Sequence, residues 1–227
     1  MAVYLQEIVA IDRGGKEAYL ESVRTRFAPY AERTRGMRLI WLGSTIGSTA
    51  AWPETIAVWE LRDWAHYADV CARMYTESTS EKELREWWPE ASKLRLRSRS
   101  QTLVGAAFSP AFDDLLAQGV AGTAFAFSTY RAKPGALAIL LDSLGRRVAD
   151  EESRGRRLVG AYEVAFTNDL AYAIWAHEAL ADLAGYEQQR TRDERLEGCD
   201  GFSEHWGFAV PGSPLWPKGR AGGAKVW

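Results

Sequence analysis

The sequence has little that could hold a metal ion or a disulfide. Its 227 residues contain only two cysteines and three histidines. Cys71 and Cys199 lie far apart with no Cys-x-x-Cys pattern, so we expect both to be free thiols. His66, His177 and His205 form no HxH or HExxH pattern. A zinc site normally needs three or four clustered ligands, so we expect no protein metal site.

The sequence also lacks the marks of a membrane or secreted protein. It has no run of 18 or more apolar residues, and its first residues lack the basic segment and apolar core of a signal peptide. Its net charge of −2 gives no whole-molecule field that would recruit nucleic acid or an anionic membrane. Walker A, GxGxxG and GxSxG patterns are absent as well. These absences predict a cytoplasmic protein without a membrane span or a nucleic-acid partner.

Aromatic residues, in contrast, are abundant. The chain has 10 Trp, 9 Tyr and 8 Phe. That much aromatic surface either fills a large core or lines an apolar cavity.

An internal repeat is the main organising feature. Arg35-Gly36-Met37-Arg38-Leu39 corresponds to Arg154-Gly155-Arg156-Arg157-Leu158, at an offset of 119 residues (154 − 35). In both copies the glycine follows a helical pattern and precedes a β-prone run. This is where a helix ends in a left-handed residue, a conformation that glycine adopts without steric cost.

Each half carries the same order of elements. We expect strands at residues 3–11, 39–41, 55–61 and 98–104, and again at 125–130, 158–162, 170–177 and 204–210. A helix follows the first strand of each half, and a second helix follows the third strand, with Asp63 as N-cap in the first half. The first half adds a helix with a capping box, Ser80-x-x-Glu83, that we expect to end at Trp87-Trp88-Pro89.

The order β-α-β-β-α-β is that of a ferredoxin-like unit, with two helices on one face of an antiparallel sheet. We therefore predict an α+β fold made by tandem duplication. The first half is expected at residues 1–110, a linker at 111–122, the second half at 123–215 and a C-terminal tail at 216–227. Because both faces of strands such as TIAVWEL are apolar, we expect the two sheets to close an α/β barrel.

The chain resembles the NIPSNAP-like branch of the dimeric α/β-barrel superfamily. The resemblance rests on the turns before the first helices (Gly14-Gly15 and Pro134-Gly135), the Arg-Gly-x-Arg-Leu motif, the Trp of each third strand, and the last strands that lead into Ser-Pro. It implies a single-chain barrel. Members of this superfamily include cofactor-free monooxygenases of aromatic polyketides, polyketide cyclases and haem-dependent enzymes, so the resemblance selects no single activity.

Two residues are candidates for acid–base catalysis. His205 lies in the last predicted strand, and alternation places it with Gly207 and Ala209 on the face that we expect to border a cavity. Small neighbours would leave room there for a ligand. Glu7 interrupts an apolar strand, where burial would raise the pKa of its carboxyl group. Only one of Gln6 and Glu7 can face the cavity, because adjacent strand residues point to opposite sides.

Binding residues are expected around these groups. Arg95, Arg97 and Arg99 alternate along one strand, either as a clamp for a carboxylate or phosphate or as charges that protect a sheet edge. For substrate binding the candidates are Arg97 and Arg99 together with four strand aromatics: Trp41, Trp59, Tyr162 and Trp175. His177 is the candidate axial ligand if the protein binds haem, and otherwise an ordinary hydrogen-bonded or surface histidine.

The sequence thus favours a cofactor-independent enzyme that acts on a small hydrophobic, aromatic or polyketide-like molecule in the barrel, by proton abstraction of the monooxygenase, cyclase or isomerase type. Alternatives are a non-catalytic carrier, a haem-binding protein, or an interaction module of the same shape. The chain would be a monomer or a homodimer. Trp216 and Trp227 of the tail are candidates for dimer contacts.

Overall fold

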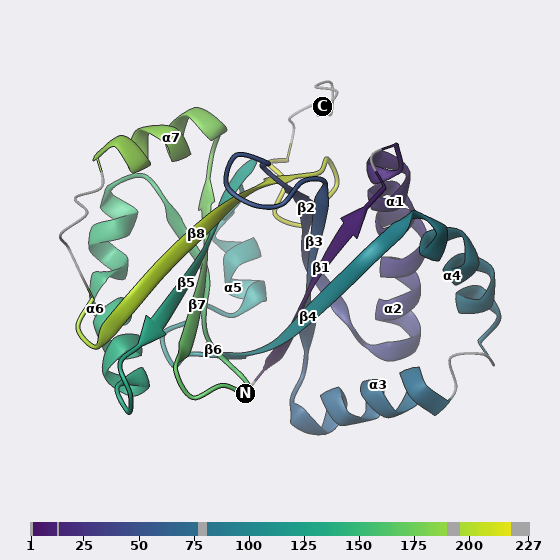
Figure 1. Ribbon diagram of the computed structural model, residues 1–227, viewed down its shortest axis with the longest axis horizontal. Helices are drawn as coiled ribbons and strands as arrows, with labels where there is room; N and C mark the ends of the chain where they lie inside the picture. Colours follow the sequence, from purple (N-terminus) through teal and green to yellow (C-terminus); the bar gives the residue numbers. More distant parts are fainter. Residues whose placement is uncertain (1, 13, 77–80, 190–195, 219–227) are drawn as a thin grey trace.

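The computed structural model describes residues 2–12, 14–76, 81–189 and 196–218 (Figure 1). The first half runs through β1 (Val3–Ile11), α1 (Lys16–Ser22), the π-helix η1 (Val23–Phe27), α2 (Ala28–Arg35), β2 (Arg38–Thr45), β3 (Glu54–Leu61), α3 (Trp64–Thr76), α4 (Lys82–Leu94) and β4 (Arg95–Gly105). After α5 (Phe112–Ala117), the second half follows with β5 (Ala124–Ala132), α6 (Leu137–Ser153), β6 (Arg157–Val164), β7 (Leu170–His177), α7 (Leu180–Gln189) and β8 (Cys199–Ala209).

The strands form one closed antiparallel barrel in the order β1-β3-β2-β8-β5-β7-β6-β4. Within this ring, β4-β1-β3-β2 and β8-β5-β7-β6 are two copies of the ferredoxin-like sheet. Short ladders join them, Gly43–Thr45 with residues 207–209 and Leu103–Gly105 with residues 162–164. Figure 1 shows α1, α2, α3 and α4 outside the first sheet and α6 and α7 outside the second. The predicted fold, a tandem ferredoxin-like α/β barrel, is confirmed.

The repeated Arg-Gly motif ends a helix in both halves. Gly36 follows α2 with a φ of 62°, and Gly155 follows α6 with a φ of 95°. Both values lie in the left-handed region, which glycine occupies at little cost. Each glycine lets the chain turn directly into the second strand of its half.

Alternation along the strands creates three apolar clusters. One fills the barrel and includes Trp41, Phe127 and Tyr172. The other two lie between each sheet and its helices and include Trp59 in the first half and Trp175 in the second. All five side chains are essentially buried. Both faces of each sheet are therefore covered, as the apolar strands require.

The segment expected to be a linker contains α5, which packs against the barrel cluster through Phe112 and Leu115. Arg38 lies over the Phe112 ring, 4.6 Å from its centroid, and donates to Asp113 at 2.7 Å. Arg38 also pairs with Glu60 of β3. The helix thus covers one end of the barrel.

Part of the predicted C-terminal tail lies against the same barrel. Leu215 is fully buried in the barrel cluster, and Trp216 packs on that cluster and on Phe208. Trp216 therefore makes contacts within its own chain, while Trp227 lies outside the described residues.

Helix α4 departs from its predicted boundaries. The expected end at Pro89 is wrong, because the helix continues to Leu94 with Pro89 inside it. Trp87 and Ala91, one turn apart, are both buried against the first-half core, and this packing offsets the backbone hydrogen bond that proline cannot make. Asp63 accepts a hydrogen bond from the His66 backbone at 2.8 Å, as expected of an N-cap. Ser80 of the predicted capping box lies outside the described residues.

In the described parts of the chain, no helix is long and apolar enough to cross a membrane.

Candidate functional site

A polar network crosses the barrel interior at Gln6. This side chain is fully buried on β1 and donates to the Tyr172 hydroxyl of β7 at 2.7 Å. Gln101 of β4 donates to the Gln6 side-chain oxygen at 2.5 Å. Burial raises the pKa of Tyr172, because the phenolate would lose its hydration. The hydroxyl therefore keeps its proton and can donate it to a further acceptor.

His205 lies in the same interior, on β8 opposite Phe127 of β5. The two rings are stacked, with centroids 5.1 Å apart and planes 8° from parallel. Within the described residues, the buried Nε2 of His205 has no hydrogen-bond partner. Burial, and to a lesser degree the charge of Arg99, lower the pKa of His205 to about 4. The imidazole is therefore neutral near pH 7 and can accept a proton.

Arg97 and Arg99 lie at the edge of this site and share one side of β4. Each guanidinium lies 3.6 Å from a different oxygen of Glu54, the first residue of β3. The Glu54 side chain is only 3% exposed, whereas those of Arg97 and Arg99 are 71% and 63% exposed. A buried carboxylate thus holds two exposed cations, which still present N–H donors to solvent.

Aromatic rings occupy the room beside Gly207, a neighbour of His205 on β8. A Cβ added to Gly207 would lie 2.7 Å from the Phe127 ring and 3.0 Å from Trp41. Trp41 itself packs edge-on against Phe125 and Phe127. Gly207 therefore accommodates the protein's own side chains, so the room that this small residue provides is not by itself a ligand space.

The predicted aromatic wall is split between different layers. Trp41 and Tyr162 lie in the barrel, where Tyr162 packs against Tyr4 with ring centroids 5.0 Å apart. Trp59 and Trp175 lie on the helix-facing sides of their sheets, so their expected place in a barrel cavity is wrong.

Glu7 also faces the helices, because Gln6 takes the barrel side of β1. It lies 3.5 Å from Arg95 and lines a small cavity beneath α4 together with Trp59. The prediction that Glu7 borders the barrel cavity is therefore wrong, whereas a catalytic role for it stays a prediction. The structure brings His205 and Arg99 together and leaves Glu7 on the other side of the sheet.

A second polar cluster lies beneath the helices of the second half. The Arg156 guanidinium lies between the rings of Trp175 and Tyr186, 4.0 and 4.1 Å from their centroids. It pairs with Glu151 at 2.9 Å and with Glu204 at 3.9 Å. The Arg156 and two carboxylate side chains are all less than 10% exposed. Burying such an ion pair costs desolvation free energy, which good pairing geometry has to offset. The two aromatic rings contribute further attraction to the guanidinium.

His177 adjoins this cluster and is 1% exposed. Burial, and then the Arg156 charge, lower its pKa to about 4, and neither ring nitrogen has a partner in the part of the chain that the structure describes. Its ring makes edge contact with Tyr186 at 5.8 Å. A haem on His177 would have to displace both Tyr186 and the Arg156 pair, so these residues do not fit a haem site.

Sequence reasoning did not single out Tyr172, Gln101 or Arg156. Gln101 continues the alternation of Arg97 and Arg99 by two residues, and Arg156 stands where the first half has Met37. Both signals are present in the sequence, but their meaning depends on which side of the sheet faces the barrel.

In the described residues, no group of three or more His, Cys, Asp or Glu is arranged to hold a metal ion. Cys71 and Cys199 are not disulfide-bonded, as expected, and the Cys199 thiol donates to the Gly201 carbonyl at 3.3 Å.

Comparison with known proteins shows similarity in fold. No protein-family model and no curated protein matches the chain. Among solved structures, a candidate monooxygenase from Lactobacillus acidophilus aligns over 92% of this chain and 93% of its own, with a TM-score of 0.61 and 7% identity. An anthrone oxidase-like protein aligns over 92% of both chains, with a TM-score of 0.61 and 10% identity.

Structures of NIPSNAP family proteins are also among the matches. One from Agrobacterium tumefaciens aligns with 48% of this chain and 98% of its own, at 20% identity and a TM-score of 0.40. At these identities the two alignments over 92% of this chain show a shared fold alone, and the activity of this chain has to be argued from its own residues.

Proposed function

We propose that this protein, in which the two halves of one chain close an α/β barrel, is an enzyme that removes a proton from a small, largely apolar aromatic molecule. His205 would be the base. The observation that carries the proposal is the buried Nε2 of His205, which has no partner among the described residues. A buried acceptor without a partner costs free energy, which a substrate proton donor would recover.

The residues around His205 support this chemistry. Stacking on Phe127 fixes the plane of the imidazole, so that its nitrogens face a defined direction. Proton removal leaves negative charge on the substrate, and the Arg99 guanidinium is close enough to lower the pKa of His205. The same positive charge would stabilise an enolate or phenolate. The hydroxyl of Tyr172, held by Gln6, is a further donor on that side.

A base with a pKa near 4 is weak, but a bound substrate could raise the pKa of His205. The pKa of His205 is depressed by burial and by Arg99. A substrate with an anionic group on Arg99 would cancel the second contribution and raise the pKa toward the working pH. The base would therefore become stronger when the correct substrate is bound.

The first test is an absorption spectrum from 300 to 700 nm with native mass spectrometry of the same sample. A colourless protein that carries a small aromatic molecule is the expected result. A Soret band with a haem-sized mass increment would contradict the cofactor-independent proposal.

The second test is deuterium exchange, followed by NMR, at the acidic C–H of aromatic 1,3-diketones in D₂O. We expect His205→Gln to lower exchange by about 100-fold, the usual scale of general base catalysis. His177→Gln is the matched control, because it alters another buried histidine of low pKa outside the barrel. Equal exchange by the wild type and His205→Gln would overturn the proposal, and binding without exchange would identify a carrier.

A further inference from the structure

We propose that the first half has a second small-molecule site, between its helices and its sheet, that binds a small neutral aromatic compound with a hydroxyl group. This site lies on the other side of β1 and β3 from His205. It goes beyond the proposed proton abstraction and does not depend on it.

The inner part of the site is a cavity of about 10 Å³, enough for a single water molecule. It is enclosed by η1, α4 and the strands of the first half. Its walls are mostly apolar and aromatic, with one carboxylate: Glu7, Val9, Tyr19, Val23, Phe27, Leu42, Thr55, Ala57, Trp59 and Trp87.

The polar groups of this wall define what could bind. The Glu7 carboxylate only accepts hydrogen bonds when it is ionised, and its ion-pair contact with Arg95 is 3.5 Å long. The indole Nε1 atoms of Trp59 and Trp87 are buried and have no partner among the described residues. Each is a hydrogen-bond donor that lacks an acceptor, because an indole N–H can only donate. A hydroxyl group can donate to the carboxylate and accept from an indole N–H at the same time. Flat aromatic walls suit the rest of an aromatic alcohol or phenol.

A larger groove lies directly outside. It has a volume of about 270 Å³ and lies between α2 and α4. Phe27 and Trp87 line both the groove and the inner cavity. The Phe27 ring is stacked on Trp87 with centroids 4.5 Å apart and meets Trp59 edge-on at 5.4 Å. Phe27 and Trp87 therefore form the partition between the two spaces.

The backbone at Phe27 has an uncommon geometry. Phe27 ends the π-helix η1, where the N–H of Ala28 bonds to the Val23 carbonyl. Short π-helical turns are rare and occur frequently at functional sites. If Phe27 turns toward the groove, the inner cavity and the groove become one pocket.

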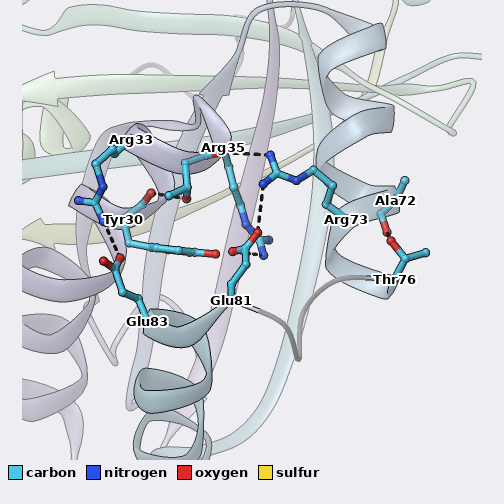
Figure 2. A network of polar contacts seen from close by, with 9 residues as sticks. Tyr30, Arg33, Arg35, Ala72, Arg73, Thr76, Glu81 and Glu83 are labelled. Carbon is cyan, nitrogen blue, oxygen red and sulfur yellow. Dashed lines mark hydrogen bonds and ion pairs between the residues drawn. The ribbon is translucent and has the colours of Figure 1, made fainter.

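Ion pairs that do not involve Phe27 connect the helices on both sides of the groove. Figure 2 shows Arg33 of α2 reaching Glu83 of α4, 2.5 Å apart, and both residues line the groove. At the start of α4, Glu81 binds Arg35 of α2 and Arg73 of α3 (Figure 2). The pocket can therefore open by a change of one side chain while α2 and α4 stay in place.

Charge separates this site from the barrel. Arg26 and Arg33 line the outer groove, but the described residues that line the inner cavity include Glu7 and no lysine or arginine. The inner cavity would therefore repel a carboxylate, whereas Arg97 and Arg99 would attract one. We therefore choose three probes of similar shape: 2-naphthol, naphthalene and 2-naphthoate. The site should bind 2-naphthol about tenfold more tightly than either of the others, since a hydrogen bond to a charged group contributes at least that factor.

The readout is the indole N–H region of a ¹H–¹⁵N NMR spectrum of the full chain. Trp59→Phe and Trp87→Phe assign the two signals, and Trp175→Phe assigns that of a buried, unpaired indole outside the site. We expect 2-naphthol to move the Trp59 or Trp87 signal downfield and to leave the Trp175 signal in place. In Glu7→Gln, the affinity for 2-naphthol should fall and that for 2-naphthoate should rise, which a purely structural Glu7 would not produce.

Three results would overturn the proposal: no saturable binding of 2-naphthol, shifts confined to other indoles, or equal affinity for 2-naphthol and naphthalene. The measurement is independent of His205, because His205→Gln should leave all of these shifts unchanged. Loss of the shifts in that variant would place the ligand in the barrel instead.

Discussion

His205 and Phe127 lie opposite each other on β8 and β5, and their rings are nearly parallel at a centroid distance of 5.1 Å. This contact fixes the imidazole of His205, which faces the barrel interior, against the Phe127 ring. It also explains why His205 is a neutral group with an unpaired nitrogen, since the ring is shielded from water on that side. The nearby cation is Arg99, so the electrostatic state of His205 is set by β5 on one side and β4 on the other.

The first prediction concerns the pKa of His205. Removing the charge in Arg99→Gln should raise this pKa above its value of about 4, because an imidazolium would no longer face a cation. The pKa should stay below 6.5, since burial is the larger cause of the shift and is unchanged. An NMR titration of the imidazole C2 proton measures it. Arg97→Gln is the control and should have the smaller effect, and a pKa that falls in Arg99→Gln would contradict this account.

The second prediction is a loss of stability in mild acid. His177 and His205 both have a folded-state pKa of about 4, below the unfolded value of about 6.5. The unfolded chain therefore binds protons first, and stability falls as the pH drops below 6.5 and continues to fall to about 4. At pH 5 each histidine should contribute a loss of about 2 kcal/mol in the free energy of unfolding relative to pH 7.5.

Urea unfolding at the two pH values measures this loss. His177→Gln should show a smaller difference between pH 7.5 and pH 5 than the wild type, whatever its absolute stability. If the difference in the variant equals that in the wild type, His177 is not the titrating group.

Much of the fold could be predicted from the sequence, but which residues face the barrel and which face the helices could not. The strands Val3–Ile11 and Leu170–His177 have the predicted boundaries, because apolar runs and turn residues mark them clearly. A period of two shows which residues share a face, yet both faces here are apolar. Gln6 therefore entered the barrel and Glu7 the helix layer, although the sequence pattern allowed the reverse.

The same ambiguity explains the errors over Trp59 and Trp175, which were expected beside Trp41. A one-residue change of phase moves a side chain to the other face, and bulges in β2 and β6 shift the register there. The buried position of Arg156 depends on rings from β7 and α7 that only the tertiary structure brings together. Local sequence signals carry no information about such contacts.

The third prediction contrasts two glycines. In Gly43→Ala the new Cβ would lie 2.3 Å from the backbone oxygen of Phe208 and 2.5 Å from the Trp41 ring. The β2–β8 ladder would have to move, at a cost of about 3 kcal/mol in the free energy of unfolding. In Gly185→Ala, within α7, nothing lies within 4 Å of the new Cβ, so helix propensity should stabilise the protein by about 0.5–1 kcal/mol. Thermal unfolding of both variants tests this. If Gly43→Ala were as stable as the wild type, the β2–β8 ladder would be able to shift at little cost in free energy.

The last prediction concerns Arg156, which is held between two aromatic rings and two carboxylates. Arg156→Met removes the cation between Glu151 and Glu204 and leaves Glu151 a longer contact with Arg147, at 3.7 Å, so the free energy of unfolding should fall by about 3–5 kcal/mol. Arg156→Lys should recover only part of this loss, because an ammonium group lacks the planar guanidinium that packs between the rings. Urea unfolding at pH 7.5 measures all three proteins.

A double substitution of Glu151 and Glu204 by Gln in the Arg156→Met background separates charge from packing. If the lost stability comes from uncompensated charge, these substitutions should restore a large part of it, because no buried carboxylate then remains unpaired. The control is Arg157→Met one residue further along, where the ion pair with Glu152 is half-exposed and its loss should cost less than about 1 kcal/mol. Equal losses in Arg156→Met and Arg157→Met would mean that the buried cluster contributes no more to stability than an ordinary surface ion pair.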